Sequence, residues 1–113
     1  MSDGDNIQLG NLNIEVIETP GHSGDHVSYL AHINNKKILF AGDLIFYEGK
    51  VSLQHIYDCN VFEIGKSIKK LEKKEIDVLL PGHDTIVLKE AQSHVQTSIN
   101  YFNNSIIPPN IIY

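Results

Sequence analysis

Three metal-competent side chains follow short apolar segments at turns that contain glycine. These turns are Pro20-Gly21-His22, Gly42-Asp43 and Pro81-Gly82-His83. Glycine permits a sharp bend, which directs the next side chain away from the end of a strand. Neighbouring strand ends lie side by side in a sheet, so these side chains can converge although they are distant in sequence. Two imidazoles and a carboxylate suit zinc, iron or manganese, so the sequence predicts a metal site formed by His22, Asp43 and His83.

The segment TPGHSGDHV (residues 19–27) contains further metal-competent side chains beside His22. It could form a self-contained cluster, or it could supply one ligand while the other residues serve the backbone. His26 lies four residues after His22, but a turn and the start of a strand separate them, so they need not share a face. We expect Asp25 and His26 to serve the turn and the next strand, with His26 as a ligand being the less favoured alternative.

The remaining histidines and Asp84 have simpler interpretations than metal binding. We expect surface or helix positions for His32, His55 and His94. His55 follows Asp43 closely enough in sequence to stay a minor candidate for the site. Asp84 is expected to serve its turn or to orient a ligand.

The composition is typical of one small globular domain and excludes several classes of partner. The chain has 113 residues, of which 42% are apolar and 20% charged. Its net charge of −5 argues against nucleic acid or an anionic membrane as the main partner. The single cysteine, Cys59, cannot form an intramolecular disulfide, so we expect a cytoplasmic location. Apolar runs fall short of the roughly 20 residues that span a bilayer.

Hydrophobic periodicity predicts four strands, a long loop, and then a helix, a strand and a second helix. The expected strands are residues 6–9, 11–18, 26–33, 36–42 and 76–83, and the expected helices are residues 61–74 and 89–103. Asn34-Asn35 predicts a tight hairpin turn, and Asn60 is the expected helix N-cap. This order predicts an α/β (α+β) fold with one mixed β-sheet, helices on one face, and the other face solvated or covered by something else. The apolar tail, residues 104–113, has no predicted place in this fold.

Three motifs resemble those of a known family. TPGHSGDHV, ILFAGDLIF and VLLPGHD resemble the later motifs of the metallo-β-lactamase-fold hydrolases, a superfamily that includes glyoxalase II-type thioesterases. The resemblance implies that His22 is the third histidine of a first metal site, that Asp43 bridges two metals, and that His83 binds the second. It further implies two Zn²⁺ ions per complete site, with Fe or Mn as alternatives. A metal-bound hydroxide would then hydrolyse an ester, thioester or amide bond.

The first motif of this superfamily, H-x-H-x-D-H, has no copy in the chain, and no histidine precedes Thr19. The resemblance therefore implies that residues 1–113 form a single partial domain, the C-terminal half of an αββα sandwich. One hypothesis is a hydrolase that acts on a small-molecule substrate only when an N-terminal half completes it. The alternative is a non-catalytic half-domain that self-associates as a homodimer or acts as a binding module. The missing motif leaves open whether this chain alone is an enzyme.

Overall fold

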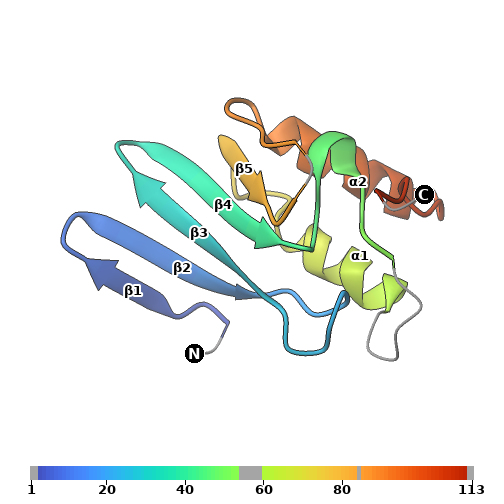
Figure 1. Cartoon of the computed structure of the whole chain (residues 1–113), viewed down its shortest axis with the longest axis horizontal. Helices are drawn as coiled ribbons and strands as arrows, with labels where there is room; N and C mark the ends of the chain where they lie inside the picture. The colour runs from blue at the N-terminus through green and yellow to red at the C-terminus, as the bar shows by residue number, and fades with distance from the viewer. Residues whose placement is uncertain (1–2, 54–59, 84, 112–113) are drawn as a thin grey trace.

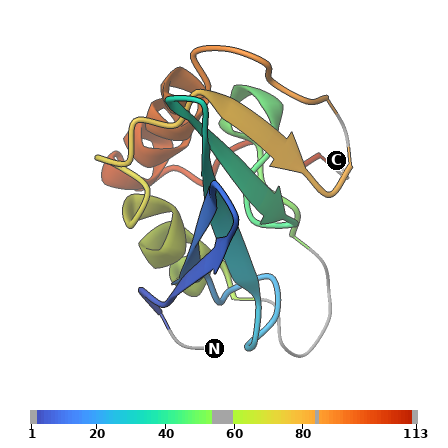
Figure 2. The ribbon, with the colours of Figure 1, turned by 90° about the vertical axis from the view of Figure 1, so that its left-hand side faces the viewer.

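The computed structural model describes residues 3–53, 60–83 and 85–111. The elements are β1 (Asn6–Leu9), β2 (Leu12–Glu18), β3 (Val27–Ile33), β4 (Lys36–Gly42), the 3-10 helix η1 (Tyr47–Gly49), α1 (Val61–Lys69), β5 (Val78–Pro81) and α2 (Gln92–Asn103). The strands form one sheet in the order β1-β2-β3-β4-β5. The first four are antiparallel and β5 runs parallel to β4. The predicted α+β fold, with a mixed sheet and helices on one face, is confirmed (Figures 1 and 2).

The core lies between the sheet and the two helices. Leu30 pairs with Leu39, and Leu39 with Leu79, so these three side chains form a row across the sheet. All three are at most 1% exposed. They belong to one buried cluster with residues of both helices, among them Ile64, Ile68, Val95 and Ile99. Burial of this apolar row is the main force that holds the helices on this face.

The opposite face of the sheet is apolar and partly exposed. Successive side chains of a strand point to opposite faces, so Tyr29 and its partner Phe40 lie on the face away from the helices. Phe40 is 44% exposed, and Ile33 on the same face is 38% exposed. Ile14 and Val16 of β2 lie on this side as well, where Val16 is 0% exposed. This partial exposure agrees with the prediction that the helices of the chain cover only one face of the sheet.

Several element boundaries differ from those predicted. The first helix ends at Lys69 rather than at residue 74, because Leu71 and Lys74 donate their amides three residues back, to Ile68 and Leu71, in tight turns. The second helix begins only at Gln92, because Glu90 has a φ of 55°, outside the helical region. Within the long loop, periodicity missed the short helix η1.

The strand predicted at residues 76–83 is shorter than expected. β5 extends only from Val78 to Pro81, and the chain bends at Gly82 and His83. Val78 and Leu79 are 9% and 0% exposed, whereas Leu80 is only partly buried because it pairs with Phe40 on the face that the helices do not cover.

The apolar tail has a defined place. Asn110 forms a parallel bridge with Val51, whose amide donates to the Pro109 carbonyl at 3.0 Å. The Asn110 side chain accepts from the Leu53 amide at 3.2 Å and donates to the Leu53 carbonyl at 3.1 Å. The tail therefore holds the segment that follows β4 and η1.

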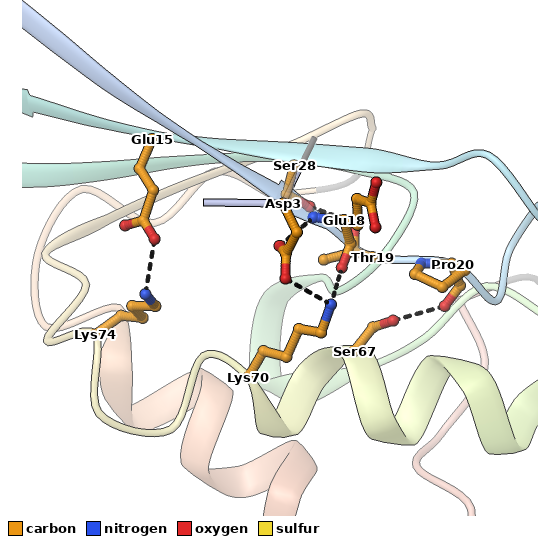
Figure 3. A network of polar contacts seen from close by, with 9 residues as sticks. All are labelled: Asp3, Glu15, Glu18, Thr19, Pro20, Ser28, Ser67, Lys70 and Lys74. Atoms are coloured by element: carbon orange, nitrogen blue, oxygen red, sulfur yellow. Dashed lines mark hydrogen bonds and ion pairs between the residues drawn. The ribbon is translucent and has the colours of Figure 1, made fainter. Parts of the chain in front are cut away.

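A polar network joins the end of β2 to α1 (Figure 3). The Lys70 ammonium donates to the Glu18 carbonyl at 2.7 Å, and Asp3 accepts from the Glu18 amide at 2.8 Å. The Ser67 hydroxyl donates to the Pro20 carbonyl at 2.7 Å. The Glu18 amide, followed by the nearby charge of Lys70, holds the pKa of Asp3 below its usual value despite partial burial. This network fixes where the chain leaves β2 and turns toward His22.

Candidate metal centre

Three chain segments bring His22, Asp43 and His83 together at one edge of the sheet. Strands β2 and β4 are both antiparallel to β3, and β5 is parallel to β4, so all three run in the same direction and end at the same edge. His22 Nε2 lies 3.4 Å from Asp43 Oδ2, and His83 Nδ1 lies 3.4 Å from Asp43 Oδ1. The side chains of His22, Asp43 and His83 are 13%, 34% and 53% exposed, so the group opens to solvent on the His83 side.

This convergence requires glycine at positions 21 and 82, because neighbouring groups occupy the space that a β-carbon would fill. A Cβ at Gly21 would lie 2.5 Å from the backbone nitrogen of Ile64, so the His22 turn packs directly on α1. A Cβ at Gly82 would lie 2.9 Å from Asp43 Oδ1. The Gly82 amide also donates to the Gly42 carbonyl at 2.6 Å, which ties the His83 turn to the Asp43 turn.

The hydrogen bonding of His22 fixes its ring. Its Nδ1 lies 3.3 Å from the Ser52 carbonyl, which can only accept, so Nδ1 carries the proton. In the neutral ring, Nε2 then presents a lone pair to the carboxylate of Asp43, which is also only an acceptor. Two facing acceptors require a cation or a proton between them. Their separation is close to that of two ligands on a tetrahedral zinc with bonds of about 2.0–2.2 Å.

His83 approaches the other carboxylate oxygen, and its ring stacks on Phe46 with centroids 5.0 Å apart. The centre therefore consists of two histidine–carboxylate pairs that share Asp43. Within residues 3–53, 60–83 and 85–111, no group of three or more His, Cys, Asp or Glu side chains is arranged to hold a metal ion. Each pair instead brings one imidazole nitrogen and one carboxylate oxygen together on its own side of Asp43. Imidazole nitrogen and carboxylate oxygen are donors that zinc accepts, so the chemistry of each pair fits part of a metal site.

Both ring nitrogens of His26 form hydrogen bonds with groups of the protein. Its Nε2 accepts from the Asp43 amide at 3.2 Å, and its Nδ1 lies 2.9 Å from the Thr19 hydroxyl. Burial, followed by the nearby His22, lowers the pKa of His26, while Asp43 opposes this shift. Asp25 accepts from the Ser23 hydroxyl in the exposed turn, which agrees with its expected local role.

The other candidates lie away from the centre or outside the described residues. His94 lies on α2, and its Nδ1 accepts from the Glu48 amide at 2.8 Å. His32 lies within β3, where it pairs with Asn13 of β2. His55, Cys59 and Asp84 fall outside the residues that the structure describes.

Sequence reasoning missed two contributors to the site, Phe46 and Ser52. Phe46 is an apolar residue of a loop, and Ser52 contributes only its backbone carbonyl. Every residue has a backbone carbonyl, so no sequence pattern could have identified Ser52 as the partner of His22.

The sequence matches the sequence model of the Metallo-beta-lactamase superfamily over residues 1–83, which includes all three turns of the centre. The chain belongs to this superfamily. It is 45% identical over 87 residues to a hydroxyacylglutathione hydrolase of Hahella chejuensis, covering 77% of this chain and 30% of that protein. It is 32% identical over 91 residues to the beta-lactamase-like protein 2 homolog of Drosophila melanogaster, covering 80% of this chain and 28% of that protein.

Solved structures share the fold. A metallo-beta-lactamase from Pontibacter korlensis aligns with a TM-score of 0.67 at 21% identity, covering 92% of this chain and 47% of that structure. A metallo-beta-lactamase from Staphylococcus aureus aligns with a TM-score of 0.63 at 23% identity, covering 95% of this chain and 37% of that structure. The chain thus spans about a third of these curated relatives and less than half of these solved structures. None of the helices in the described parts of the chain combines the length and apolar character needed to cross a membrane.

Proposed function

We propose that this chain supplies His22, Asp43 and His83 to the two-metal centre of a hydrolase whose other ligands come from an N-terminal half with the H-x-H-x-D-H motif. The observation that carries the proposal is the shared carboxylate, with one histidine 3.4 Å from each oxygen. The facing acceptors of His22 and Asp43 support a cation at that position. Membership of the superfamily supports the identity of the missing ligands.

Each residue has a distinct part in this proposal. His22 binds through Nε2 while its Nδ1–H holds the ring on the Ser52 carbonyl, a common second partner for a metal-binding imidazole. Asp43 would hold metal through its carboxylate oxygens, and His83 would bind on the exposed side, where its ring stacks on Phe46. Zinc is the favoured ion, with iron or manganese as alternatives, and such ions acidify water and polarise a carbonyl. All three side chains must be unprotonated to bind, so affinity falls in acid.

The substrate class follows from the relatives rather than from the site. Two of the similar curated proteins, from Hahella chejuensis and Francisella philomiragia, are named hydroxyacylglutathione hydrolases. We therefore propose a small-molecule acyl thioester as the substrate of the completed protein, with ester or amide bonds as the wider class. The cytoplasmic location stays a prediction from the single cysteine.

Complementation tests this function. The chain would be purified alone and after co-expression with an N-terminal metallo-β-lactamase segment that carries H-x-H-x-D-H. Zinc content would be measured by elemental analysis, and hydrolysis with a hydroxyacyl thioester of glutathione. We expect weak or no zinc binding and negligible hydrolysis for the chain alone, and a gain of both in the complex. A stoichiometric, tightly held pair of zinc ions in the chain alone, or a zinc-free complex, would contradict the proposal.

The partly exposed sheet face favours a second candidate, a self-associating half-domain. Phe40 and Ile33 expose apolar surface at 44% and 38%, and burial against a second copy would remove it from water. Light scattering at increasing protein concentration tests this alternative. A monomer at the highest concentration excludes the homodimer, whereas a dimer that dissociates when the N-terminal half is added supports both candidates.

A further inference from the structure

We propose that His26 is a positioning residue that aims the Asp43 carboxylate through the Asp43 backbone amide. This inference rests on the proposed metal centre, because the position of Asp43 matters most where its two oxygens serve two histidines. It assigns to His26 a role distinct from that of a ligand and from that of a turn residue.

The hydrogen bonds around His26 define its tautomer. The Asp43 amide donates to Nε2 at 3.2 Å, so Nε2 bears the lone pair and Nδ1 bears the proton. Nδ1 then donates to the Thr19 hydroxyl at 2.9 Å, which leaves the Thr19 proton for the Ser28 hydroxyl at 2.9 Å. Thr19 and Ser28 are both 0% exposed, so water does not compete for these bonds. The ring is therefore oriented from β2 and β3 before it contacts Asp43.

The residue before Asp43 lies close to the same ring nitrogen, Nε2. Gly42 has a φ of 54°, and a Cβ at this position would lie 2.8 Å from His26 Nε2. The backbone thus reaches the imidazole as closely as a residue without a side chain allows. Because the amide of Asp43 is fixed to Nε2, rotation of the Gly42–Asp43 peptide is restricted. That peptide sets the direction in which the Asp43 carboxylate leaves the backbone.

In the proposed centre His26 is not itself a ligand. It contacts the ligand Asp43 through a hydrogen bond and so orients it. Removing such partners typically weakens metal affinity by about 10- to 100-fold. A residue that served only to fill space would instead affect folding without a selective effect on Asp43. Two substitutions at the same position separate these cases.

The test compares His26→Gln with His26→Asn. The Gln amide reaches the place of Nε2 and can accept from the Asp43 amide, but it no longer contacts Thr19. The Asn amide reaches only the place of Nδ1, so it can donate to Thr19 but leaves the Asp43 amide without its acceptor. Each variant loses one hydrogen bond and keeps the other, so each is the matched control for the other.

Two measurements on the full chain give the outcome. Hydrogen exchange of the Asp43 amide reports the bond directly, and NMR titration with zinc chloride follows the imidazole resonances of His22 and His83. For His26→Asn we expect exchange and the zinc dissociation constant each to rise by about tenfold or more. For His26→Gln we expect both to stay within about threefold of the unchanged chain.

Equal losses in the two variants, or no loss in His26→Asn, would overturn the proposal. Thermal unfolding of both variants shows whether they are folded to the same extent. If zinc moves no resonance in the unchanged chain or in its complex with the N-terminal half, the proposed metal centre is wrong. Asp43 amide exchange then still decides whether His26 holds this turn, so the two failures are distinguishable.

Discussion

The carboxylate of Asp43 is the atom group on which the centre depends, because it contacts a histidine through each oxygen. Replacing Asp43 with Asn removes its charge but allows the new amide to donate to the lone pair of His22 Nε2. We therefore expect Asp43→Asn to unfold at the same temperature or higher, while zinc affinity falls more than tenfold. Thermal unfolding and zinc titration by NMR measure the two effects.

The matched control is Asp25→Asn, which removes an equal charge from the exposed turn next to His22. It should leave the zinc response unchanged. A similar loss of zinc affinity in both variants would mean that general charge, rather than the position of Asp43, attracts the ion.

Gly42 and Gly10 allow a second comparison at the scale of single residues. Both have a positive φ, 54° and 60°, but a Cβ meets His26 Nε2 at 2.8 Å only at Gly42, whereas nothing lies within 4 Å at Gly10. Gly10→Ala should lower the free energy of unfolding by about 1–2 kcal/mol through backbone strain alone. Gly42→Ala should cost about 1–3 kcal/mol more, because the ring must also move. Urea denaturation measures both, and equal losses would show that the ring yields freely.

At the scale of elements, the network between β2 and α1 predicts a dependence on pH. The folded-state pKa of Asp3 is lowered, chiefly by the Glu18 amide and also by Lys70. Its contribution to stability is thus present above the ordinary aspartate pKa of 3.8 and is lost as the pH falls through the lowered value. Because Asp3 is 49% exposed, Asp3→Asn should cost less than about 1 kcal/mol at pH 7.

Unfolding at pH 7 and in strong acid checks this prediction. The difference between Asp3→Asn and the unchanged chain should vanish once Asp3 is protonated. Glu72→Gln, at an exposed position in the turn after α1, serves as the control and should have little effect at either pH. A difference that persists in strong acid would show that packing, rather than charge, explains the effect of Asp3.

Sequence patterns predicted the elements where local chemistry determines them. The Asn34-Asn35 turn was predicted because asparagine tolerates positive φ, and the structure gives values of 49° and 66° there. Asn60 caps α1 through its side chain, as expected. The end of α1 was wrong by several residues because tertiary contacts from Lys70 to β2 favour a turn there, and helical spacing does not report such contacts.

The same limit applies to the site. The glycine turns predicted where His22, Asp43 and His83 would gather, because strand ends share a sheet edge. They could not predict that the two histidines meet opposite oxygens of Asp43, since this depends on a bulge between Phe40 and Gly42 in the β4–β5 pairing. Their role as metal ligands stays a prediction.

At the scale of the whole molecule, the two faces of the sheet should respond differently to the same kind of truncation. Leu39 is 0% exposed beneath the helices, whereas its neighbour Phe40 is 44% exposed on the other face. We expect Leu39→Ala to cost about 2–5 kcal/mol, and Phe40→Ala clearly less although phenylalanine is larger. Urea denaturation at low protein concentration measures both. A larger loss for Phe40→Ala would indicate that a second copy or another partner already buries that face.

The pairing of Asn110 with Leu53 also has a consequence for the order of folding. This contact joins residues 57 positions apart, and the contact between His22 and Ser52 joins residues 30 positions apart. Closing such long loops costs more chain entropy than forming the adjacent hairpins, so these contacts are expected to form late. The metal-competent edge would then be among the last parts of the molecule to assemble and among the first to open. A nascent or partly unfolded chain would have the antiparallel strands β1 to β4 paired before it could hold an ion.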